Sequence, residues 1–175
     1  AITNNSHSAF KVNDWNSWKA SVVKNDPDCY FLIVHMEEDE RVGTDALEIG
    51  KEDLLPITLI EADLIRKEGN QTKMPLVVLI GCETSDLDSY SFGAPDLLIQ
   101  TGSAIVLSNF TRIRGKQAGR IVIRLVELLK QYAQEPVEFG VVIRKLKQEL
   151  LAEGNMVSLT LLAHGDADWK ISTKA

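Results

Sequence analysis

Apolar runs of strand length alternate along this chain with segments whose apolar residues recur at helical spacing. Four runs carry no acidic or basic side chain except histidine and are rich in β-branched and aromatic residues, which predicts strands buried on both faces. They cover residues 29–36, 75–81, 104–109 and 156–165, and a shorter segment, 46–50, alternates like a further strand. Residues 37–45, between two of these strands, are predicted to form an acidic loop.

Helices are predicted between the strands. Two amphipathic helices are expected in succession before the last run, one over residues 116–134 and one after the break at 135–138. Their apolar positions are Ala118, Ile121, Val122, Leu125, Leu128 and Leu129, then Phe139, Val142, Ile143, Leu146, Leu150 and Leu151. Shorter helices are expected after Asn13 or Asp14, from the capping box Thr58-x-x-Glu61 to Arg66, and over residues 94–102.

This alternation predicts an α/β fold with a mainly parallel sheet and helices on both faces. The 175 residues fit one domain, in which residues 1–28 form an N-terminal lead-in with a short helix. The chain starts with neither Met nor a signal-peptide pattern. We therefore expect it to be the C-terminal piece of a longer protein.

Composition and charge narrow the function classes. The net charge of -6 argues against direct binding of nucleic acid, and no apolar run reaches the ~20 residues of a membrane-spanning helix. The two cysteines cannot form a disulfide framework, and no Cys/His spacing resembles a zinc site. We expect a cytoplasmic protein with no metal, no cofactor and no membrane contact.

Polar residues with reactive side chains stand at the ends of the buried strands. Functional sites in open parallel sheets lie beyond the carboxyl ends of the strands. We expect that edge to receive His35 and Met36, Cys82, Ser108 to Phe110, and His164 to Asp166. The sequence thus predicts that the imidazole of His35 and the thiol of Cys82 share one edge of the sheet, on neighbouring strands.

A thiol and an imidazole at one edge allow nucleophilic catalysis. A nearby imidazole lowers the pKa of a thiol and carries its proton, and a backbone N–H beside the thiol can bind an oxyanion. The alternative is structural, because cysteine often behaves as a small buried apolar residue. Cys29 begins its strand and is interpreted as a packing residue, and His164 as a locally hydrogen-bonded imidazole.

Four segments together resemble the CHAT domain, a caspase-like cysteine peptidase family of prokaryotes. They are CYFLIVH with the following ALEIGKEDLLPITLIEADLI, then PLVVLIGCETSD, LLIQTGSAIVLSNFTRI and LTLLAHGDADWKI. Their order and spacing agree over residues 29 to 172. The resemblance implies a caspase-like three-layer sandwich and a domain that cleaves a protein or peptide substrate, regulated by other domains of the same chain.

The resemblance also assigns roles to individual residues. It implies that His35 is the general base, that Cys82 is the nucleophile, and that the backbone N–H groups of Met36 and Cys82 bind the oxyanion. The first specificity pocket would be lined by Ser108, Asn109, Phe110 and Arg112. Met36 departs from the family, which usually has glycine after the histidine, and the basic TRIRG segment stands where the family often has an acidic residue.

Two other functions compete with a peptidase. Met36 and the basic TRIRG segment favour a catalytically degenerate CHAT domain that acts as a binding or scaffold module. A nucleotide- or phosphate-binding α/β domain ranks last, because neither GxGxxG nor GK[ST] occurs in the sequence.

Overall fold

The structure is a computed structural model that describes residues 11–40, 43–50, 53–70, 72–81, 93–132, 135–166 and 168–171. Within these residues the largest sheet contains, in spatial order, β3 (Asp53–Pro56), β2 (Thr44–Ile49), β1 (Cys29–Asp39), β4 (Leu76–Gly81), β5 (Ile105–Asn109) and β7 (Leu161–Gly165). A small second sheet pairs β6 (Val137–Glu138) with β8 (Lys170–Ile171).

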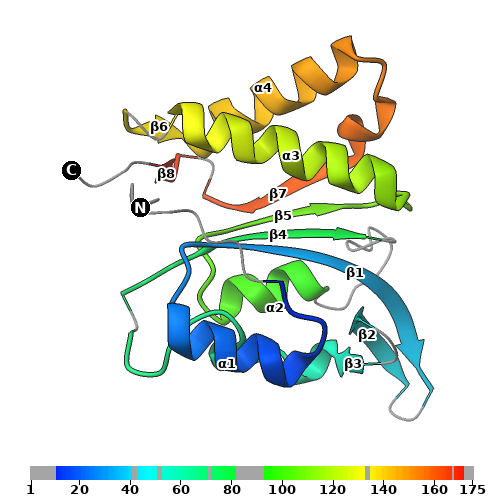
Figure 1. The fold of residues 1–175 in the computed structure, drawn as a ribbon, viewed down its shortest axis with the longest axis vertical. Helices are drawn as coiled ribbons and strands as arrows, with labels where there is room; N and C mark the ends of the chain where they lie inside the picture. The colour runs from blue at the N-terminus through cyan, green and yellow to red at the C-terminus, as the bar shows by residue number, and fades with distance from the viewer. Residues whose placement is uncertain are drawn as a thin grey trace.

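Helices cover both faces of the large sheet. The helices α1 (Trp15–Asn25) and α2 (Ala94–Gln100) lie on one face, and α3 (Gly115–Tyr132) and α4 (Phe139–Ala152) lie on the other (Figure 1). The expected short helix after Asn13 or Asp14 is α1, whose N-cap is Asp14. The molecule has three layers, which confirms the predicted α/β class with helices on both faces.

The centre of the sheet is parallel and its flanks are antiparallel. The strand β4 runs parallel to both β1 and β5. The strands β2 and β3 join β1 as an antiparallel pair at one side, and β7 pairs antiparallel with β5 at the other. The parallel core agrees with the prediction from the fully apolar runs.

The predicted direction of the last strand was wrong. In the β5–β7 pair, Asn109 lies opposite Leu161 and Ile105 lies opposite Gly165, so β7 ends at the amino end of β5. The reason is the pair of helices in this connection: α3 leads the chain away from the carboxyl end of β5, and α4 brings it back to that edge (Figure 1). Gly165 and Asp166 therefore stand at the edge of the sheet opposite to His35.

Three shorter predictions also need correction. Of the run 156–165 that was predicted to be a strand, Met156–Thr160 forms a 3-10 helix, and β7 covers only Leu161–Gly165. The strand β1 continues through Asp39 because residues 35–39 pair with β2, so the predicted acidic loop begins later. The predicted helix from Thr58 to Arg66 is replaced by two 3-10 turns, Ile57–Leu59 and Ala62–Leu64. Thr58 lies inside the first turn and not at its N-cap, so the capping box does not form.

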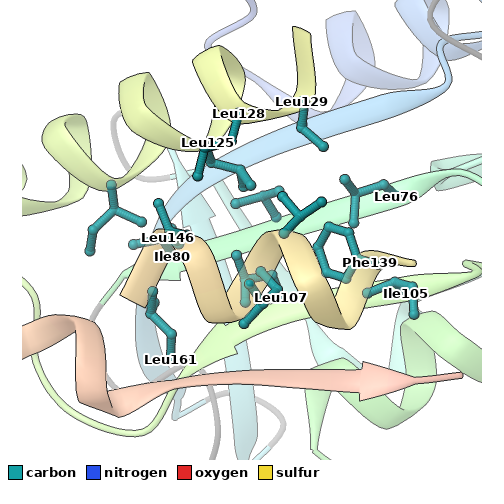
Figure 2. Packing of buried hydrophobic residues seen from close by; sticks show 14 of the residues in the cluster. Leu76, Ile80, Ile105, Leu107, Leu125, Leu128, Leu129, Phe139, Leu146 and Leu161 are labelled. Carbon is teal, nitrogen blue, oxygen red and sulfur yellow. The ribbon is translucent and has the colours of Figure 1, made fainter. Parts of the chain in front are cut away.

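The sheet separates two hydrophobic cores. On the α3/α4 side, Phe139, Leu125, Leu128 and Leu146 pack onto side chains of β4 and β5 (Figure 2). On the α1/α2 side, the core includes Trp15, Trp18, Leu64, Leu79 and Leu98. All six residues of β4 are buried, and the side chains of this strand contribute to both cores.

No helix in the described part of the chain is long and apolar enough to cross a bilayer.

Candidate active site

The site is built around the carboxyl ends of β1 and β4. The parallel register between these strands runs to Val34 opposite Gly81. His35 is the next residue of β1, and Cys82 follows Gly81 in the sequence. The predicted nucleophile Cys82 itself lies outside the described residues, so the structure describes the two strand ends and the imidazole of the predicted pair.

His35 is exposed on the face of β1 that looks toward the α3/α4 layer. Side chains alternate along a strand, so His35 shares its face with Phe31 and Ile33. Phe31 packs partly against the α3/α4 core, whereas Ile33 is 55% exposed. The imidazole therefore stands on an exposed part of this face, beyond the apolar side chains of Phe31 and Ile33.

Glu48 is the carboxylate that pairs with His35 across the β1–β2 ladder. The two residues are direct partners in the antiparallel register, and Glu48 is half-buried. Opposite side chains in such a pair share one face with Cβ atoms ~4.5–5.5 Å apart. The sequence analysis predicted an acidic loop directly after His35 and did not identify Glu48 as its neighbour. Pairing the predicted strand 46–50 with the strand before it could have found it.

Met36 points to the opposite face of the sheet. Its side chain is half-buried and packs against the α1/α2 core, next to its partner Leu47. The methionine side chain therefore does not crowd the face that carries His35. The role of the Met36 amide at the oxyanion stays a prediction.

Asn109 ends β5 and holds the end of β4 through its side chain. It is fully buried. Its Oδ1 accepts a hydrogen bond from the N–H of Gly81 at 3.1 Å, and its Nδ2 donates to the carbonyl oxygen of Gly81 at 2.8 Å. Nδ2 also donates to the carbonyl of Thr111 at 2.5 Å. This link between the two strand ends was not predicted, because the sequence suggested only a place for Asn109 in the substrate pocket.

Ser108 is also buried and binds the imidazole of His164. Its Oγ lies 2.8 Å from Nε2 of His164 on the neighbouring strand β7. Burial lowers the pKa of His164, and the carboxylate of Asp96 partly offsets this effect. The interpretation of His164 as a locally hydrogen-bonded imidazole is confirmed.

The other two predicted pocket residues have accessible side chains. Phe110, just beyond β5, is 37% exposed, and its N–H donates to the carbonyl of Thr160 at 3.2 Å. Arg112 is exposed two residues further on. Of the four residues predicted to line the pocket, Phe110 and Arg112 are thus the ones with side chains at the surface.

The second cysteine has a different environment. Cys29 begins β1 and packs against the α3/α4 core, as expected for a packing residue. Burial, with a smaller contribution from Asp28, raises the pKa of its thiol to about 12. Cys29 is therefore almost entirely in the unreactive thiol form at neutral pH.

Over the described residues, His, Cys, Asp and Glu side chains form no group of three or more that could hold a metal ion. Comparison with known proteins finds no matching family model and no matching curated protein.

Proposed function

We propose that this chain is a CHAT-type, caspase-like cysteine endopeptidase domain, in which His35 and Cys82 cleave a peptide bond of a protein partner. The observation that carries the proposal is the register of the central strands. The last described pair of β1 and β4 is Val34 with Gly81, and the next residues in sequence are His35 and Cys82. Regulation by other domains of a longer chain belongs to the same proposal.

The proposed reaction proceeds through an acyl-enzyme. His35 takes the proton of the Cys82 thiol, and the sulfur attacks the carbonyl carbon of the scissile bond. The backbone N–H groups of Met36 and Cys82 bind the resulting oxyanion. His35 returns the proton to the leaving amine, and water then hydrolyses the thioester. Glu48, opposite His35 in the ladder, is suited to orient the imidazole.

The exposed residues beyond β5 suggest where specificity arises. The guanidinium of Arg112 favours an acidic residue at the cleavage point, because arginine binds carboxylates with paired hydrogen bonds. Phe110 offers an apolar surface beside it. The buried Ser108 and Asn109 would support this pocket from beneath.

The test is cleavage of peptide pools by the wild type and by Cys82→Ala, His35→Ala and Cys29→Ala. We expect the first two variants to lose at least ~100-fold in kcat/KM, since each removes a member of the dyad. Cys29→Ala is the matched control and should cleave like the wild type, because Cys29 is partly buried and the raised pKa of its thiol keeps it unreactive. Equal cleavage by all four proteins would rule out the dyad.

A scaffold module without activity is the competing function, and Met36 in place of glycine favours it. The two functions differ in the reactivity of Cys82. In an active peptidase, a peptidyl electrophile should label Cys82 of the wild type much faster than it labels a small model thiol. In the His35→Ala variant, the labelling of Cys82 should be slow. Wild-type labelling no faster than the model thiol, in a folded sample, would support the scaffold.

A further inference from the structure

The α3/α4 layer carries an excess of positive charge in a chain that is acidic as a whole. The helices α3 and α4 contain seven lysine and arginine side chains and two glutamates, whereas the net charge of the chain is -6. Both glutamates bind Arg124, Glu127 at 2.6 Å and Glu149 at 2.7 Å, so their charges are offset within the layer. The other cations leave this side of the molecule positively charged.

One face of α3 collects exposed side chains at helical spacing. The buried positions of this helix face the sheet (Figure 2). The opposite positions are all exposed: Lys116, Arg120, Ile123, Glu127 and Lys130. This set, termed the α3 outer face, extends for ~20 Å, because a helix rises ~1.5 Å per residue. At its centre Ile123 is 62% exposed, which places an apolar contact surface among cations.

The cations in the first half of α3 lack the partners that a solvated helix surface usually has. On such surfaces lysine and arginine are paired with acids three or four residues away. No Asp or Glu occurs between Asn109 and Glu127, and neither Lys116 nor Arg120 forms an ion pair with another described residue. Their charges are therefore not used within the described part of the chain.

The position of these cations is also unfavourable for the helix itself. The first turn of α3 contains Lys116 and no acidic residue, and the exposed Arg114 stands directly before Gly115, where the helix begins. The N-terminal end of a helix carries a partial positive charge, which favours acids and disfavours cations. Cations that break this local rule without a gain in stability indicate a role outside the fold.

We propose that the α3 outer face binds an acidic segment of a partner protein, with a large apolar residue of that segment packed on Ile123. The carboxylates of the segment complement Lys116, Arg120 and Lys130. A protein segment suits this face better than nucleic acid, because the chain has a net charge of -6 and the face has no aromatic side chain for base stacking. A lipid surface would need a broader apolar face than one isoleucine.

Fluorescence anisotropy of labelled probes tests this proposal on the whole chain. The main probe is a helical peptide of about 15 residues, long enough to span the face, with glutamates four residues apart and a central leucine. A second peptide has glutamine in place of every glutamate. Labelled oligouridylate and vesicles that contain phosphatidylserine are the competing anionic probes.

The variants are matched between the two layers of the molecule. Arg120→Glu and Lys116→Glu each reverse a charge on the α3 outer face, and Ile123→Ser removes its apolar side chain. The controls stand on α1, on the other side of the sheet (Figure 1). Lys24→Glu changes the net charge equally at an exposed position, and Val23→Ser removes a side chain that is 50% exposed.

We expect the glutamate peptide to bind, and to lose at least ~5-fold in affinity between about 0.05 and 0.3 M NaCl, because salt screens exposed charges. Arg120→Glu and Lys116→Glu should each weaken binding about 5- to 30-fold, and Ile123→Ser about fivefold with an unchanged salt dependence. Both α1 variants should stay within about twofold of the wild type, because exposed charges are screened within ~10 Å. Lys116→Glu should also raise the urea midpoint, since it places an acid at the positive end of α3.

Several results would overturn the proposal. They are the absence of binding, equal binding of the glutamine peptide, equal weakening by Lys24→Glu and Arg120→Glu, and binding that Ile123→Ser does not affect. Tighter binding of oligouridylate or of vesicles, lost in the same α3 variants, would overturn the assignment to a protein segment. A lower urea midpoint for Lys116→Glu would give this cation a structural role and remove it from the binding face. Cys82→Ala should bind the peptide like the wild type, so the outcome is independent of the proposed peptidase activity.

Discussion

The imidazole of His164 lies between β5 and β7 in an environment that disfavours its charged form. Its Nε2 is 2.8 Å from the buried Oγ of Ser108, and burial lowers its pKa below the ordinary value of 6.5, with Asp96 acting in the opposite direction. In the unfolded chain the same imidazole takes up a proton near pH 6.5. The folded protein takes it up only at a lower pH. Folding and protonation of His164 therefore oppose each other.

The expected result is a loss of stability on mild acidification. Above pH 6.5 both states hold a neutral His164 and the effect is absent. As the pH falls through that value, the unfolded state binds a proton that the folded state does not, so the free energy of unfolding decreases. Urea unfolding between about pH 7.5 and 5.5 measures the free energy of unfolding of the wild type and of His164→Gln. This free energy should depend less on pH in the variant than in the wild type. If the free energy of unfolding changed with pH to the same extent in both proteins, His164 would not be the source of the pH dependence.

Individual residues show which parts of the site a sequence can predict. His35 was predictable because it ends an apolar run, and the end of a strand can be read from composition. Glu48 depends on which residue of β2 lies opposite His35, and the hairpin register decides that. The hydrogen bonds of Asn109 to Gly81 join residues on different strands, so spacing within one strand does not show them.

At the scale of the elements, the long helices and central strands were predicted well, because their apolar spacing is regular. The helix predicted over 116–134 is α3, Gly115–Tyr132, and the helix predicted after 138 is α4, Phe139–Ala152. The direction of β7 was predicted wrongly, because it depends on how two consecutive helices return the chain to one edge of the sheet. The two-residue strands β6 and β8 are too short to produce a pattern.

The start of α4 is joined to the C-terminal part of the chain by one aromatic pair. Phe139 is fully buried, its N–H donates to the carbonyl of Trp169 at 2.8 Å, and the two rings meet edge to face at 6.3 Å. Phe139→Ala should reduce the free energy of unfolding by ~3–5 kcal/mol, because it leaves a cavity between α4 and the sheet.

A double-mutant cycle tests whether the pair is coupled. Urea unfolding of Phe139→Ala, Trp169→Ala and the double variant should give a coupling of ~0.5–1.5 kcal/mol, as expected for an aromatic pair in contact. A coupling of zero would mean that the contact between the two rings contributes no stability beyond that of burying Phe139.

At the scale of the whole molecule, the sheet divides the interior without dividing the domain. The two cores share no residue, yet each contains side chains of β4: Val78 and Ile80 face the α3/α4 layer, and Val77 and Leu79 face the α1/α2 layer. A strand that is buried on both faces cannot leave one core without exposing the other. The two layers should therefore unfold together, although the sheet lies between them.

This arrangement predicts additive losses within one cooperative transition. Leu98→Ala in the α1/α2 core and Leu146→Ala in the α3/α4 core each remove a buried side chain, at an expected cost of ~2–5 kcal/mol. Because the sheet separates the two sites, the loss of unfolding free energy in the double variant should equal the sum of the single losses within ~0.5 kcal/mol.

Circular dichroism and tryptophan fluorescence should report the same urea midpoint for each protein, since Trp15 and Trp18 stand in one core and Trp169 packs against the other. Separate midpoints for the two probes would mean that β4 does not couple the layers. In that case the strand end that carries Gly81 could loosen with one layer while the other stays folded.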